Sequence, residues 1–230
     1  MANLTNTIKW YVRGLFPLPV YIPIISLVVL AQLYTILSLK SLGEFSLFTQ
    51  MLLIPFIILV VGTHFVRGKS LTIFELSLLG SWRRLAVSKI IAFSIGLLPF
   101  IVVEILLLWL SKNVLFIAPI LTSFLVYSAL SILSSLSSSQ LTAFTIGLIF
   151  ILLIPISAVV LLENLGSLGA TSGTPLGIIL YLIVPLASFE YYRNGVVSVY
   201  PLMGFSIAFI ISVIMIFTYI LLFQRQEFKP

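Results

Sequence analysis

Several residue types on which enzymes depend are missing, or nearly missing, from this sequence of 230 residues. It contains no cysteine, which excludes disulfides, thiolate nucleophiles and cysteine-ligated metals. It contains no aspartate and a single histidine, His64, so neither the ligand cluster of a zinc protease nor the aspartates that hold magnesium in phosphotransferases can be assembled. Most classes of enzyme are thereby excluded, and no metal or other cofactor is expected.

Charged residues are also scarce. Only 8% of the residues are charged and 61% are hydrophobic, whereas a soluble globular protein carries about 25% charged residues. Apolar runs of about 18 or more residues recur along the chain, and each is long enough to cross a hydrocarbon layer about 30 Å thick. The sequence therefore predicts an all-α, polytopic membrane protein with a single domain, residues 1–230.

The stretch GTHFVRGKS, residues 62–70, is similar to a phosphate-binding loop but does not match one. The motif requires four residues between its first glycine and Gly-Lys-Ser, and a strand before that glycine. Here five residues separate Gly62 from Gly68, and an apolar run precedes Gly62. We interpret the stretch as the cytoplasmic end of a span, with Gly68 as a helix cap and Arg67 and Lys69 as cationic anchors.

Six membrane spans and a short N-terminal helix are predicted. Residues 1–15 place Lys9, Trp10 and Arg13 among apolar positions, a mixture typical of a helix in the membrane interface. The apolar run at residues 176–187 has only 12 residues, which favours a re-entrant or interfacial segment before the last span. The six spans are expected at about residues 18–39, 46–66, 90–110, 114–136, 141–162 and 199–222.

The distribution of lysine and arginine predicts the orientation, because these residues concentrate on the cytoplasmic side. With six spans, nine lysine and arginine residues lie on the same side as both termini and three lie on the opposite side. A seventh span would reduce this difference in positive charge between the two sides. We therefore expect a multi-pass protein of the cell membrane with both termini in the cytoplasm. The nine are Lys9, Arg13, Arg67, Lys69, Arg83, Arg84, Lys89, Arg225 and Lys229, and the three are Lys40, Lys112 and Arg193.

The long cytoplasmic connection, residues 67–89, contains a predicted amphipathic helix at about residues 71–80. Ser70 or Thr72 can cap its start, and Gly80 can end it. Its apolar face can rest on lipid or dock on a cytosolic partner, and the pattern leaves both possibilities open. Leu71, Phe74 and Leu78 share that face, while Thr72, Glu75 and Leu79 share another.

This arrangement resembles the permease subunits of type-2 ATP-binding-cassette (ABC) exporters in their compact form. Such subunits have an N-terminal interfacial helix, six spans, and a coupling helix between spans two and three. The sequence of that connection typically has a leucine-rich helix, then an arginine, and then a lysine that opens span three. LTIFELSLLGSWRRLAVSK supplies the leucine-rich helix, Arg83 or Arg84 at the arginine position, and Lys89, with Gly80 near the position where the family has a proline.

A second part of the resemblance precedes the last span. The family often has an apolar stretch, a proline, an aromatic residue and a glycine there. LIVPLASFEYYRNG provides these as Pro185, Phe189 and Gly195. The short basic tail FQRQEFKP is also similar to the family's C-terminus.

The resemblance implies a transport subunit that is not itself an enzyme. A separate cytosolic ABC ATPase would hydrolyse the ATP, and two ATPases would assemble with this chain and a second permease copy, identical or related. Membrane lipid is the other expected partner, and nucleic acid is not. The alternative is a membrane scaffold or assembly subunit of a larger complex, without transport of its own. The implied ATPase-docking residues are Leu71, Phe74, Glu75, Leu78, Trp82 and Arg83.

Two polar features lie inside the predicted spans. Glu104 lies about 22 Å beyond Lys89 along a helix, and ionisable groups at such depths usually face the bundle interior or a wet cavity. It is a candidate for the translocation path, with a protonated packing residue or one that snorkels to the outer surface as the alternatives. A serine stripe in the fourth span either permits close helix packing or lines the same path: Ser128, Ser131, Ser135 and Ser138.

Overall fold

The structure, a computed structural model, describes most of the chain as helices joined by turns. The described residues are 4–15, 22–23, 26–27, 29–30, 34, 49–63, 69–110, 112–137, 139–167 and 174–225. They contain no β-strand. The predicted all-α class is therefore confirmed over this part of the chain.

Four helices are long and apolar enough to cross a membrane. They are Trp82–Leu110, Val114–Ser134, Gln140–Asn164 and Pro201–Arg225, and they correspond to the third, fourth, fifth and sixth predicted spans. The second predicted span is described only over residues 49–63, and most of the first lies outside the described residues. Four apolar helices of this length support insertion into a membrane, and the total of six spans stays a prediction.

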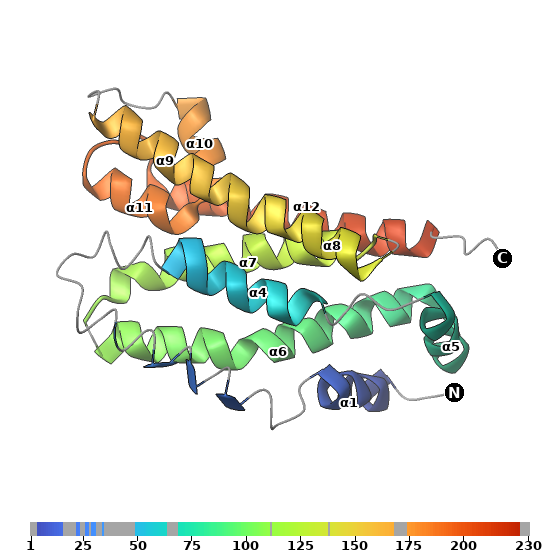
Figure 1. Cartoon of the computed structure of the whole chain (residues 1–230). Coiled ribbons are helices and arrows are strands. Elements are labelled where there is room, and N and C mark those ends of the chain that lie inside the picture. The colour runs from blue at the N-terminus through green and yellow to red at the C-terminus, as the bar shows by residue number, and fades with distance from the viewer. Residues whose placement is uncertain are drawn as a thin grey trace.

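The helices form a bundle around α7, which packs against α12, α4, α11 and α6 (Figure 1). The short helices α1 and α5 lie near one end of the bundle, and α10 and α11 lie at the other. Large aromatic side chains fill the centre, among them the buried Phe93, Phe124 and Tyr127. The bounds are α1 Leu4–Leu15, α4 Ile54–Thr63, α5 Lys69–Leu79, α6 Trp82–Leu110, α7 Ile117–Ser134, α8 Gln140–Gly147, α9 Ile154–Ser167, α10 Thr174–Ile183, α11 Pro185–Arg193 and α12 Pro201–Arg225.

Two helical segments contain a stretch of π-helix, and both stretches lie next to the same four-residue motif. Leu-Leu-Ile-Pro occurs at residues 52–55 and again at 152–155. The π-helical segments η1 (Thr49–Leu53) and η3 (Leu148–Leu153) each end directly before the Ile-Pro pair. A proline inside a helix has no N–H to donate and its ring collides with the carbonyl four residues back, and a wider turn relieves that collision.

The segment before the last span is a pair of short helices, α10 and α11. They meet at Val184, whose extended φ of −135° follows from the proline after it, because a residue before proline is disfavoured in helical geometry. The Tyr127 hydroxyl donates a hydrogen bond to the Ile183 carbonyl at this break, at 3.0 Å. With 10 residues, α10 is about 15 Å long and cannot cross the membrane by itself.

Candidate functional site

Helix α5 is joined to α6 by a tight turn. Gly80 has a φ of +66° and donates its N–H to the Leu76 carbonyl at 2.8 Å, which is the left-handed glycine cap that ends many helices. The predicted end at Gly80 is therefore confirmed. After Ser81, helix α6 begins at Trp82, eight residues before the predicted start of the third span at about residue 90. The connection at 67–89 is therefore largely helical, because the first turns of α6 continue beyond the span.

The two sides of α5 differ sharply in exposure. Thr72, Glu75 and Leu79 are buried, and the prediction that they share one face agrees with this. On the other side, Ile73 and Phe74 expose 47% and 56% of their surfaces. Ile73 was not among the predicted docking residues. The side chains of Leu71 and Leu78, which were, lie outside the described residues.

A buried ion pair holds α5 to α6. Glu75 Oε2 lies 3.5 Å from Lys89 Nζ, and both residues are buried. A carboxylate removed from water is costly unless an opposite charge compensates it, and Lys89 provides that charge. Glu75, one of the implied docking residues, therefore points into the bundle in this structure and does not lie on the exposed side of α5.

Aromatic contacts extend this ion pair to α12. The Lys89 ammonium lies 5.3 Å from the centre of the Phe223 ring, within the range of a cation–π interaction. Trp82 meets the same ring edge-on at 5.6 Å. Of the other predicted docking residues, Arg83 is exposed to solvent at the start of α6. One cluster therefore connects α5, α6 and α12.

A small cavity with a mostly apolar lining lies beside Lys89. Its polar lining comes from Lys89, Ser131, Ser135 and Tyr219, together with the backbone at Gly62. The volume is about 10 Å³, close to the smallest that holds one water molecule. In this conformation the cavity can hold about one water molecule beside Lys89 but cannot pass a larger solute.

The predicted polar residues of the spans are only partly brought together. Ser131 and Ser135 line the cavity, whereas Ser128 does not, and Ser138 lies outside the described residues. Glu104 is fully buried, and its position in α6 places it about 22 Å along the helix from Lys89. Glu104 is not among the residues that line this cavity, so the structure does not bring it together with the serines there.

Close packing explains the position of Ser131. A Cβ atom added at Gly62 would overlap the Ser131 hydroxyl oxygen, so α4 and α7 approach each other closely at this pair. Small residues at helix contacts permit such an approach in membranes. The packing interpretation of the serine stripe therefore has direct support at Ser131.

We expect Gly62→Ala to lower the stability of the protein by about 1–3 kcal/mol, because it adds volume to a full contact. The double variant Gly62→Ala, Ser131→Ala should recover most of that loss, because the overlapping oxygen is gone. The measurement is the midpoint of thermal unfolding in detergent for both variants. A double variant less stable than Gly62→Ala would mean that the Ser131 hydroxyl has a polar role that packing does not explain.

The two ends of the bundle differ in charge. At the α5 end the single described carboxylate, Glu75, is paired inside the protein. The far end carries two cations and two carboxylates, and Arg193 lies 3.8 Å from Glu190. Burial and the neighbouring Glu163 carboxylate raise the pKa of Tyr191 to about 12, so its hydroxyl stays protonated. The exposed cations at the α5 end are Lys9, Arg13, Arg83, Arg84 and Arg225, and the far end carries Lys112, Arg193, Glu163 and Glu190.

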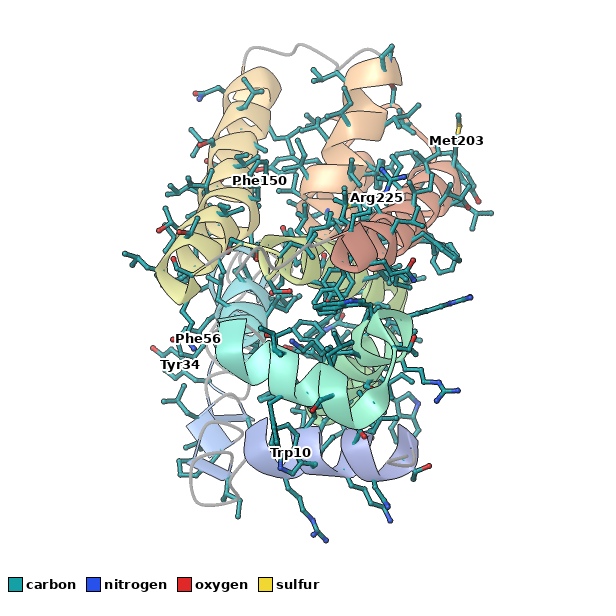
Figure 2. All side chains as sticks on the ribbon, turned by 90° about the vertical axis from the view of Figure 1, so that its right-hand side faces the viewer. Trp10, Tyr34, Phe56, Phe150, Met203 and Arg225 are labelled. Carbon is teal, nitrogen blue, oxygen red and sulfur yellow. The ribbon has the colours of Figure 1, made fainter. Side chains whose placement is uncertain are left out.

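No protein-family model, curated protein or solved structure matches this chain significantly. Its function must therefore be inferred from its own features. Three are available: the exposed side of α5, the buried ion pair behind it, and the excess of positive charge at that end. Figure 2 shows this end from outside, with α5 across the centre and α1 below it.

Proposed function

We propose that this chain is the membrane-spanning permease subunit of an ABC exporter, and that a separate cytosolic ATPase supplies the energy for transport. The observation that carries the proposal is the geometry of α5. This short helix lies across the end of the bundle, exposes Ile73 and Phe74, and is held from behind by the Glu75–Lys89 pair. An exposed apolar anchor on a helix with a fixed base is what a docking helix requires.

The length of α6 supports a protein partner rather than lipid. Its 29 residues span about 43 Å, which exceeds a hydrocarbon layer of about 30 Å by about 13 Å. If Leu110 lies at the far boundary of that layer, the first turns of α6 extend beyond the near boundary. Helix α5 is attached to the outermost of these turns. Its exposed side would then lie in water, where a cytosolic protein can cover it.

The charge difference between the two ends supports the orientation that the proposal needs. Exposed lysine and arginine side chains of membrane proteins gather on the cytoplasmic side, so the α5 end would face the cytoplasm. Helix α1 and the end of α12 lie at the same end. Both termini would then be cytoplasmic in the cell membrane, and the predicted spans at 18–39 and 46–66 would complete the six. The exposed apolar face along α12, which contains Phe209 and Ile210, would meet lipid.

The contacts behind α5 suggest how the ATPase would act on the spans. A force on α5 would reach α6 through Glu75 and Lys89, and α12 through the contact of Lys89 with Phe223. Both receiving helices are candidate spans. Movement of the ATPase would therefore be coupled to two spans at once.

The test is a purification of the complex from native membranes in mild detergent. We expect an ATPase with a phosphate-binding loop to copurify, identified by mass spectrometry, and the complex to hydrolyse ATP. Truncating an apolar anchor of this kind costs about 2 kcal/mol or more. The variant Ile73→Ala, Phe74→Ala should therefore reduce ATPase recovery more than tenfold at equal membrane levels, because its two anchors are lost.

The chain contains a matched control for this experiment. Phe209 and Ile210 on α12 are also adjacent, and each exposes 56% of its surface. Because they lie within a candidate span, Phe209→Ala, Ile210→Ala should leave ATPase recovery unchanged. Equal recovery with Ile73→Ala, Phe74→Ala and with the control would contradict docking through α5. A stable complex without any ATPase would favour the membrane scaffold.

A further inference from the structure

Helix α1 presents two cations and an indole ring to its surroundings. Lys9, Trp10 and Arg13 are exposed, with Trp10 at 49%, whereas Tyr11 is buried in the core. The helix packs against α6, and the views in Figures 1 and 2 show it lying across the direction of the long helices, with Trp10 at the lower edge of Figure 2. The outer face of α1, defined as Lys9, Trp10 and Arg13, is therefore available to something outside the protein.

Among the described residues, no carboxylate forms an ion pair with Lys9 or Arg13 on this outer face. Lys9 and Arg13 are four residues apart, so they are neighbours on one side of the helix, where like charges repel each other. Residues 1–15 contain no acidic residue. Elsewhere at this end, the carboxylate that the structure describes is Glu75, and it is buried against Lys89. An anion from outside the chain would relieve the repulsion.

The exposed indole indicates what kind of anion fits. Tryptophan in membrane proteins is enriched at the level of the lipid headgroups, where its ring meets both apolar and polar surroundings. A free phosphate would leave the Trp10 ring uncovered. A phospholipid brings a phosphate for Lys9 and Arg13 together with glycerol and acyl groups for Trp10.

We propose that the outer face of α1 is a binding site for the headgroup of anionic phospholipids. Lys9 and Arg13 contact the phosphate and the additional negative charge, and Trp10 packs beside the glycerol and upper acyl chain. The site anchors α1 at the membrane surface and ties the neighbouring start of α6 to that level. It does not depend on ATPase docking, since it uses no residue of α5.

The test uses Trp10 as a local reporter in the full-length protein. Trp82 and Trp109 are the other tryptophans, and Trp82→Phe, Trp109→Phe leaves Trp10 as the single fluorophore. The variant is reconstituted in phosphatidylcholine bilayers that contain brominated phosphatidylglycerol or brominated phosphatidylcholine at equal mole fraction. We expect brominated phosphatidylglycerol to quench Trp10 more strongly than brominated phosphatidylcholine does. The binding constant of phosphatidylglycerol relative to that of phosphatidylcholine is then above one.

Adding Lys9→Gln, Arg13→Gln should lower that relative constant by up to about fivefold for each cation at low salt. The matched control, Lys112→Gln, Arg193→Gln, removes the same amount of charge at the far end of the bundle and should leave the relative binding constant unchanged. Gel filtration and circular dichroism establish that each variant is folded. Equal quenching by the two lipids in the parent variant, or an unchanged preference without Lys9 and Arg13, would overturn the proposal. Full competition by soluble glycerol 3-phosphate would also overturn it, because the ligand would then be a free phosphate.

Discussion

Replacing Lys89 by methionine is expected to destabilise the protein by about 3–5 kcal/mol, the typical effect of leaving one charge of a buried pair without its partner. Glu75 would keep its place inside the bundle, 3% exposed, with its nearest described cation removed. The contact of Lys89 with Phe223 would be lost at the same time. The measurement is the midpoint of thermal unfolding in detergent, followed by the fluorescence of Trp82, which touches the same phenylalanine ring.

The double variant Glu75→Gln, Lys89→Met separates charge from packing. It has no buried charge at this place, and replacing a whole buried pair by neutral groups is often neutral or even stabilising. We therefore expect the double variant to recover most of the loss. If the two single losses simply add, the ion pair does not hold α5 to α6 in the way that its geometry indicates.

This pair of variants also bears on the proposed coupling. If the proposed complex with an ATPase forms, the double variant should still bind the ATPase, because Ile73 and Phe74 are unchanged on the exposed side of α5. Transport per ATP hydrolysed should fall, because α5 is no longer tied to Lys89. Unchanged transport per ATP would show that force reaches the spans by another route.

Replacing Gly204 by alanine should have a comparably large effect, about 3 kcal/mol, at the upper end of what overpacking costs. A Cβ atom at Gly204 would overlap the Tyr181 ring near its attachment to the chain. That ring is fully buried, its hydroxyl donates to the Val199 carbonyl at 3.3 Å, and it stacks edge-on against Phe205. Because the ring cannot turn away, α10 and α12 must move apart.

Gly14→Ala is the control for this prediction. It makes the same change in α1, where an added Cβ atom meets nothing within 4 Å, so its unfolding midpoint should stay close to that of the wild type. An equal midpoint for Gly204→Ala and Gly14→Ala would mean that the contact between α10 and α12 is looser than the structure shows. A large loss for Gly204→Ala alone would identify this contact as the one that positions the short helices before the last span.

The sequence by itself determined the all-α membrane class, the places of the four long helices and several of their boundaries. Hydrocarbon solvation depends on length and composition alone, so an apolar run identifies a span without knowledge of its neighbours. Glycine and proline act through their own backbone geometry. This is why Gly80 as the end of α5 could be predicted, and why the break before Pro185 follows from local sequence. The shared face of Thr72, Glu75 and Leu79 follows from helical periodicity in the same way.

Which face of α5 points inward was decided only by the tertiary structure. Periodicity groups residues into faces but does not say what lies opposite each face, and for α5 the opposite element is the start of α6. The resemblance placed Glu75 among the docking residues, and the sequence pattern did not show what its side chain would meet. The fold instead brings Lys89 within 3.5 Å of it, and a buried charge is tolerated once such a partner is present. The exposure of Ile73 and the close contacts of Gly62 with Ser131 and of Gly204 with Tyr181 have the same origin, because each depends on residues that are distant in the sequence and adjacent only after the helices have packed.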